Sequence, residues 1–169
     1  MAPNDDLLDD GKFFEDPHVL SSRIEELRAK GAKVVFANGC FELLHVGHVR
    51  YLKGAKALGD VLICAINTDE SMKLIKPDRR PVNPDVERFE IVAALEVVDF
   101  VIPLRERTPA ELLAILKPDV HTKGTDYTLD MIPERSVVEA YGGVVAIVGD
   151  DKSHSTTQMI NEIRGPILS

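Results

Sequence analysis

Two histidines stand three residues apart in the chain, His45 and His48, with Gly47 between them. If the segment is helical, this spacing brings both imidazole rings to one face. Paired imidazoles near a helix start, where free backbone N–H groups already favour an anion, can stabilise the charge that develops during phosphoryl transfer. Gly39 and Gly47 would let the main chain approach a ligand closely. The segment therefore favours phosphate chemistry over two incidental surface histidines.

Later polar residues follow apolar runs in the same way. Ser155, Thr156 and Thr157 open the last expected helix, where hydroxyls and free N–H groups can hold phosphate oxygens. A plain helix N-cap is the alternative interpretation of this triplet. Lys123 follows the fourth expected strand, so its ammonium group could neutralise charge on a phosphate, or could simply be solvated. His121 and His18 are interpreted as structural or solvated.

A local excess of basic side chains interrupts an otherwise acidic chain between residues 73 and 80. A triphosphate and a phosphorylated acceptor would need such a loop, although a solvated charged loop has the same composition. Lys76, Arg80 and the following Asn83 are the candidates for binding the acceptor phosphate. Arg88, on the next expected helix, is either a phosphate contact or a partner of nearby acidic side chains.

The elements that must position these residues alternate along the chain. Short apolar runs predict strands, and helical spacing or capping residues predict helices. Thr108 is the predicted N-cap of the helix that begins at Pro109. The expected strands are 33–37, 61–66, 100–102, 119–122 and 144–148, and the expected helices are 18–30, 47–58, a short one after 68, 86–98, 109–116, 133–140 and 155–164.

This alternation predicts an α/β fold, a doubly wound, Rossmann-like, five-stranded parallel sheet with helices on both faces. We expect a polar segment and helix over residues 1–30, a single domain over 31–165 and a tail over 166–169. Such sheets bind ligands at the carboxyl ends of their strands, near the point where the winding reverses. The functional residues should therefore follow the first, second, fourth and fifth strands.

Composition narrows the classes of partner. The formal net charge of −8 argues against nucleic acid as a partner. Only two cysteines occur, Cys40 and Cys64, so two free thiols are expected rather than a disulfide framework or a zinc site. No run approaches the length that spans a bilayer, and the acidic N-terminus does not look like a secretory signal. We therefore expect a cytoplasmic protein that does not bind membranes.

The segment 38–52 resembles the first motif of the His-x-Gly-His nucleotidyltransferase superfamily. The later motifs occur in the order found in one group of that superfamily, the heptose-1-phosphate adenylyltransferases, which exist alone or as a domain of bifunctional ADP-heptose synthases. The resemblance covers roughly residues 27–163. It rests on Ala37-Asn38-Gly39-Cys40-Phe41, on His45 to Leu52, on Arg80 to Pro84, on Ala93 to Glu96, on Lys123-Gly124 with Asp126-Tyr127, and on Ser155-Thr156-Thr157.

The resemblance implies that AMP passes from ATP to a sugar 1-phosphate, with release of pyrophosphate. It implies catalytic roles for His45, His48 and Lys123. Mg²⁺ would be held through the substrate phosphates rather than by a dedicated metal site. Relatives commonly dimerise, so a homodimer is favoured. The implied nucleotide-binding residues are Asn38, Gly39, Cys40, Phe41, Gly47, Arg88, Gly124, Ser155, Thr156 and Thr157.

Three departures from the family pattern lie at the expected ligand edge. Glu42 stands where the family usually has Asp, and Thr125 stands where it usually has Gly. Pro77-Asp78-Arg79 replaces the usual Gly-Pro before the Arg-Pro-Val-Asn stretch. Three alternatives therefore stay open. One is a cytidylyltransferase acting on glycerol 3-phosphate or another polyol phosphate, and another is a catalytically weak nucleotide-binding module. The third, a fragment of a class I aminoacyl-tRNA synthetase, is disfavoured by the short acidic chain.

Overall fold

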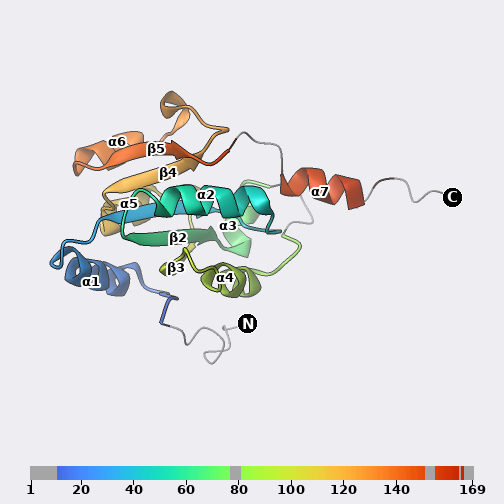
Figure 1. Ribbon diagram of the computed structural model, residues 1–169. Coiled ribbons are helices and arrows are strands. Elements are labelled where there is room, and N and C mark those ends of the chain that lie inside the picture. The colour runs from blue at the N-terminus through green and yellow to red at the C-terminus, as the bar shows by residue number, and fades with distance from the viewer. Residues whose placement is uncertain (1–10, 77–80, 151–154, 164, 166–169) are drawn as a thin grey trace.

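The computed structural model describes residues 11–76, 81–150, 155–163 and 165 of the 169-residue chain. Its centre is a five-stranded sheet with the order β3-β2-β1-β4-β5, and every pair of neighbouring strands is parallel (Figure 1). The predicted parallel α/β fold is confirmed. The strands are β1 (Val34–Gly39), β2 (Val61–Asn67), β3 (Phe100–Leu104), β4 (Val120–Gly124) and β5 (Val144–Val148).

The winding of the sheet reverses beside β1. The chain passes from β1 outward to β2 and β3, then returns to the other side of β1 and continues through β4 to β5. The carboxyl ends of β1 and β4 therefore flank the switch point, which is where doubly wound sheets leave a crevice for a ligand.

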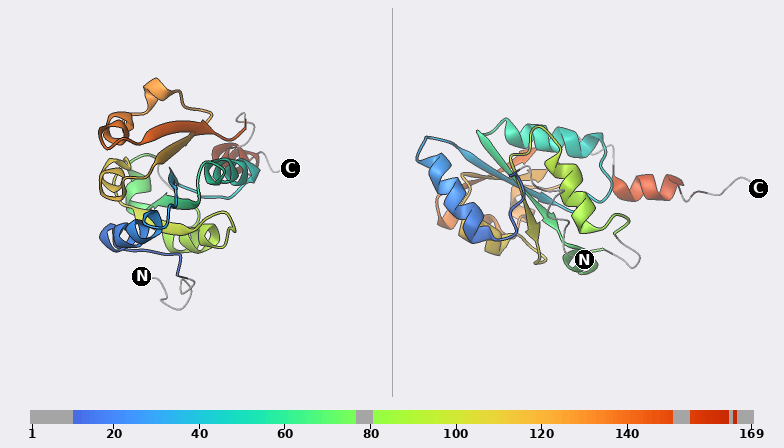
Figure 2. Two further views of the ribbon diagram at one scale, coloured as in Figure 1. Left: turned by 60° about the vertical axis from the view of Figure 1, so that its left-hand side comes forward. Right: turned by 90° about the horizontal axis from the view of Figure 1, so that it is seen from below.

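Helices cover both faces of the sheet (Figure 2). On one face, α2 (Val46–Lys56) and α4 (Asp85–Ala93) pack against alternate side chains of the central strands, including Val35 and Leu62. On the other face, α1 (Pro17–Arg28), α5 (Ala110–Leu116) and α6 (Arg135–Ala140) cover a second set that includes Phe36. Strands β2 and β3 are buried along their whole length, which explains their largely apolar sequences, whereas the edge strand β5 is partly exposed.

The segment before the first strand belongs to the same core. Phe14 donates its N–H to the carbonyl of Val101 at 2.9 Å, so the N-terminal segment pairs with the edge strand β3. Leu20 and Ile24 of α1 are fully buried. Gly31, at φ +89°, lies beyond the end of this helix, in the left-handed conformation that glycine adopts without strain.

Some predicted boundaries were wrong. The helix expected to begin at Pro109 begins at Ala110 with Pro109 as its N-cap, so Thr108 is not the cap. The helix expected to reach Val98 ends at Ala93, and the chain turns so that the Asp99 carboxylate accepts the Leu62 N–H at 2.7 Å. The remaining elements are α3 (Asp69–Lys73), η1 (Leu129–Met131) and α7 (Thr156–Ile163). Within the described residues, no helix is long and apolar enough to cross a bilayer.

Candidate active site

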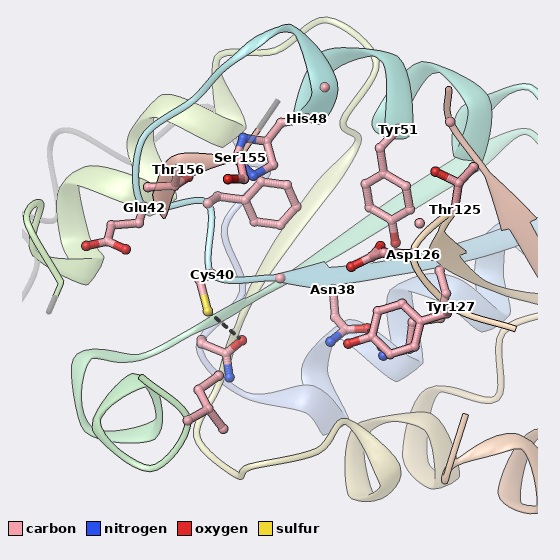
Figure 3. A pocket seen from close by; sticks show the side chains of 18 of the residues that line it. Asn38, Cys40, Glu42, His48, Tyr51, Thr125, Asp126, Tyr127, Ser155 and Thr156 are labelled. Atoms are coloured by element: carbon pink, nitrogen blue, oxygen red, sulfur yellow. Dashed lines mark hydrogen bonds between the residues drawn. The ribbon is translucent and has the colours of Figure 1, made fainter. Parts of the chain in front are cut away.

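A pocket of about 610 Å³ opens at the carboxyl edge of the sheet. Its wall includes residues that follow β1, β2, β4 and β5, as the sequence predicted, and Arg107 and Thr108 after β3 join them. Figure 3 shows side chains from the loop after β1 and from α2 in the same pocket as Asp126 and Tyr127, which follow β4. The switch point of the fold therefore coincides with this pocket.

His45 and His48 meet at the start of α2. His45 is the N-cap residue, and the two rings stack with their centroids 3.9 Å apart. The main-chain N–H of His45 donates to Nδ1 of His48 at 3.3 Å. Since Nδ1 accepts this bond, the ring proton of neutral His48 lies on Nε2. The sequence prediction that the two imidazoles share one face is confirmed by this stacking.

His48 stays neutral near pH 7. Burial, followed by the charge of neighbouring His45, lowers the pKa of His48 from 6.5 to about 4. A neutral imidazole with its proton on Nε2 is a hydrogen-bond donor that keeps its protonation state across the physiological range. The pair can therefore stabilise negative charge on a phosphate that reacts in the pocket.

The backbone after β1 is shaped around one aromatic ring. Phe41 has φ 46°, a left-handed conformation that costs energy for a residue with a side chain. Its ring lies 5.2 Å from the His48 ring and so close to Gly39 that a Cβ there would lie 3.0 Å from Cε2 of Phe41. Gly39 therefore permits the packing that seats Phe41 beneath His48.

Glu42 is a buried anchor of this loop. Its side chain is 2% exposed, and Oε1 accepts the N–H of Val82 at 2.9 Å. Asn83 donates its side-chain amide to the Glu42 carbonyl at 3.2 Å. Asn83 thus supports the loop after β1 and is not part of the pocket wall, whereas Lys76, the other described candidate for the acceptor phosphate, is part of it. Arg80 lies outside the described residues.

Arg88 is held inside the protein rather than at the pocket wall. The side chain is fully buried, with its donors directed at the carbonyl of Asn83 (3.1 Å), the carbonyl of Cys40 (2.5 Å) and the carboxylate of Asp69 (2.9 Å). This network joins the loop after β1 to α3 and α4. Arg88 therefore contacts the main chain of Cys40, one of the predicted nucleotide-binding residues, but it does not line the pocket.

Lys123 enters the pocket from the end of β4. Its Nζ lies 2.7 Å from Oε1 of Glu134 and 3.2 Å from Oδ1 of Asn38. Nε2 of His121 lies 3.1 Å from the same Glu134 oxygen. Burial opposes ionisation of Glu134, but the hydrogen bond from His121 and the charge of Lys123 outweigh it and lower its pKa to about 2. His121 is fully buried, as the structural interpretation of this residue required, and burial lowers its pKa.

The loops after β4 and β5 are tied together. Thr125 donates its hydroxyl to the Asp150 carbonyl at 2.6 Å, and the Asp150 carboxylate pairs with Arg50 of α2. Thr125 does not have a positive φ, so replacement of the family's glycine brings no left-handed strain here. At Gly124, an added Cβ would lie 2.8 Å from Oδ1 of Asp126.

Ser155, Thr156 and Thr157 all line the pocket. The Ser155 hydroxyl accepts the N–H of Gln158 at 3.0 Å, so it also caps α7, as the alternative interpretation expected. Thr156 donates its hydroxyl to the carbonyl of Leu43 at 3.3 Å, which ties the start of α7 to the loop that precedes α2. The hydroxyl triplet and the histidine pair thus face one cavity.

The two cysteines are free thiols, as expected. Cys40 lines the pocket, and its Sγ lies 3.7 Å from Oδ1 of Asn67, the contact dashed in Figure 3. Asn67 in turn donates to the Ser71 hydroxyl at 3.1 Å, so this polar chain fixes the end of β2. No cluster of three or more His, Cys, Asp or Glu side chains suited to a metal ion occurs within the described ranges.

Sequence reasoning missed Glu134, Tyr51 and Arg107. Glu134 stands eleven residues beyond Lys123, and only the fold brings the two together; its position at a helix start was the one available signal. Tyr51 donates its hydroxyl to the Thr122 carbonyl at 2.9 Å, which fixes α2 against β4. Arg107 follows β3, and the end of this strand was not expected to contribute residues to the pocket.

Comparison with known proteins places this site in a family. The cytidylyltransferase-like family matches residues 36–169. The chain is similar to the bifunctional protein HldE of Pelobacter propionicus, with 45% identity over 145 residues, and to that of Geobacter sulfurreducens, with 46% over 145 residues. Each match covers 86% of this chain and 30% of the relative, so the chain spans about 30% of the length of these relatives.

Solved structures agree with these matches. The lipopolysaccharide core biosynthesis protein of Thermoplasma volcanium is 31% identical with a TM-score of 0.61, over 72% of this chain and 100% of that one. A pantoate-beta-alanine ligase from Francisella tularensis, 17% identical with a TM-score of 0.58 over 94% of this chain and 81% of that one, shares the fold. The chain belongs to the cytidylyltransferase-like family of nucleotidyltransferases.

Proposed function

We propose that the chain transfers AMP from ATP to a sugar 1-phosphate of the D-glycero-D-manno-heptose type and releases pyrophosphate. The observation that carries this proposal is the stacked His45–His48 pair in a pocket that also holds Lys123 and the Ser155–Thr157 triplet. The sequence resemblance to heptose-1-phosphate adenylyltransferases and the similarity to HldE proteins support the choice of acceptor. The similarity to a lipopolysaccharide core biosynthesis protein from Thermoplasma volcanium agrees with this choice.

In this reaction an oxygen of the acceptor phosphate attacks the α-phosphorus of ATP. A new phosphorus–oxygen bond forms while the bond from the α-phosphorus to the bridging oxygen breaks, and pyrophosphate leaves with that electron pair. Nε2–H of neutral His48, together with His45, would donate to the oxygens of the reacting phosphate, and the Lys123 ammonium would stabilise the same charge. Ser155, Thr156 and Thr157 would hold the β- and γ-phosphates.

Mg²⁺ fits this site through the substrate rather than through the protein. The pocket wall offers imidazoles, hydroxyls, an ammonium group and separate carboxylates, but no group of three or more His, Cys, Asp or Glu side chains suited to a metal ion occurs among the described residues. The triphosphate oxygens would therefore supply most ligands of the ion, which would neutralise phosphate charge when bound. Lys76 lines the pocket and is our candidate for the acceptor phosphate. The family resemblance adds a homodimer to the proposal, and the sequence adds a cytoplasmic location.

The test is an activity assay in which the purified chain and Mg²⁺ are combined with either ATP or CTP and with each acceptor of a panel. D-glycero-D-manno-heptose 1-phosphate and glycerol 3-phosphate are the two decisive acceptors, with pyrophosphate release followed continuously and products identified by mass. The proposal expects turnover only with ATP and the heptose phosphate. Turnover only with CTP would support the cytidylyltransferase alternative. ATP binding by calorimetry without turnover on any acceptor would support a regulatory module.

A further inference from the structure

The buried carboxylate of Glu134, which lies beside Lys123 and also lines the pocket, has no place in the mechanism above. We infer that Glu134 is a positioning residue that, backed by His121, fixes the Lys123 ammonium group for the reaction. The inference rests on the proposed nucleotidyl transfer, because Lys123 is the group that would touch the transferring phosphate. Glu134 would act only through Lys123.

The Lys123 ammonium is confined by groups from three segments. Nζ lies 2.7 Å from Oε1 of Glu134 and 3.2 Å from Oδ1 of Asn38, and it stands 5.2 Å from the centroid of the Tyr127 ring. Lysine side chains have many accessible rotamers, but here two of the three ammonium protons have fixed acceptors. One direction remains for a third bond, to a ligand in the pocket.

Glu134 is itself held rigidly. The side chain is 2% exposed, and its Oε1 also accepts from Nε2 of His121, which is 0% exposed. The His121 ring packs against Phe36 in the core, with centroids 5.6 Å apart. Burial keeps His121 neutral and its pKa low, so Nε2 donates its single proton to the carboxylate. The chain of contacts therefore runs from the core through His121 and Glu134 to Lys123.

A purely structural role explains this arrangement poorly. Removing two opposite charges from water costs about as much as their attraction returns, and apolar replacements of buried ion pairs are often as stable. A buried pair whose cation also lines a pocket is better explained by preorganisation, in which the charge is aimed before the substrate arrives. The Lys123–Glu134 pair is buried, and Lys123 also lines the pocket.

The experiment is a double-mutant cycle on the full chain, with kcat and KM measured for ATP and the sugar phosphate. Glu134→Gln keeps the shape and the hydrogen-bonding oxygen and removes the charge. Lys123→Met keeps most of the volume and removes the ammonium. Glu139→Gln is the matched control, since Glu139 lies on the same helix and pairs with Arg135 at the surface. Circular dichroism and thermal midpoints show that each variant is folded at the assay temperature.

We expect Glu134→Gln to lower kcat roughly 10- to 100-fold while both KM values change less than about threefold, because positioning acts on the transition state. In the Lys123→Met background the same substitution should change kcat less than twofold. An unchanged kcat in Glu134→Gln, or an equal loss in both backgrounds, would overturn the inference. If Glu134→Gln does not fold, Glu134→Asp replaces it in the cycle with a smaller expected loss, and a parent-like kcat would overturn the inference. A parent chain without turnover would instead refute the proposed function.

Discussion

The imidazole of His48 stacks on that of His45 with ring centroids 3.9 Å apart. Nδ1 of His48 also accepts the main-chain N–H of His45 at 3.3 Å. The stack and the hydrogen bond fix the orientation and the tautomer of His48 together. The hydrogen bond depends on a neutral ring, because Nδ1 cannot accept when it carries a proton. The geometry of the pair therefore has a consequence for stability as well as for chemistry.

The first prediction concerns pH and stability. The pKa of His48 is lowered from 6.5 to about 4 in the folded protein, so the unfolded chain binds more protons between these values. The stabilisation by neutral His48 is complete above pH 6.5 and is lost as the pH falls towards 4. In urea unfolding, the parent should lose on the order of 1–2 kcal/mol more stability by pH 5 than His48→Asn does.

His121 contributes in the same direction, so the informative quantity is the difference between parent and variant. His18→Asn is the control, because His18 is exposed on α1. Parallel pH profiles for the parent and His48→Asn would contradict the assignment of the shift to His48.

Arg88 provides the second prediction. Arg88→Met should destabilise the fold by roughly 3–5 kcal/mol, because Asp69 and two main-chain carbonyls would lose a fully buried partner. Arg105→Met, which removes an exposed pair with Glu15, should change the free energy of unfolding by no more than about 0.5 kcal/mol. Chemical denaturation measures both. A stable Arg88→Met variant with a greatly raised KM for ATP would favour a direct phosphate contact instead.

Glu42 departs from the family pattern, and its contacts give the third prediction. Glu42→Asp shortens the side chain by one methylene, which should break the 2.9 Å bond from the Val82 N–H. The expected loss of stability is about 1–2 kcal/mol, seen as a lower midpoint in thermal unfolding. Glu139→Asp on the exposed face of α6 is the control. An equal or higher midpoint for Glu42→Asp would show that the longer side chain has no structural role.

The fourth prediction concerns the tie between the loops after β4 and β5. Thr125→Val keeps the shape of the side chain and removes the 2.6 Å bond to the Asp150 carbonyl. Since this bond orders two loops of the pocket wall, KM for ATP should rise about two- to fivefold with little change in global stability. Thr128→Val, in the following turn, is the control. Unchanged kinetics would mean that the loops are held without this bond.

The features predicted from the sequence were those that depend on local pattern. Apolar runs predicted β1, β2, β3 and β5, and the rule that ligands bind at strand ends predicted that His45, Lys123 and Ser155 share one pocket. Strand β5 even has the predicted limits, 144–148.

The features missed from the sequence depend on contacts between distant segments. The sequence does not distinguish a buried arginine from a surface arginine, so Arg88 was a candidate for binding a phosphate. In the structure its side chain donates to Asp69 and to two main-chain carbonyls. Glu134 stood in a helical pattern as an ordinary acidic residue. Only the fold of the segment after β4 places the Glu134 carboxylate 2.7 Å from the Lys123 ammonium group.

The central claim is tested most directly by the steady-state rate of adenylyl transfer in His45→Ala and His48→Ala beside the matched control His18→Ala. The account predicts at least a roughly 100-fold loss of kcat in each pocket variant and a parent-like rate in the control, because the pair stabilises charge that develops at the transferring phosphate. Rates within a few-fold of the parent in both pocket variants would contradict it.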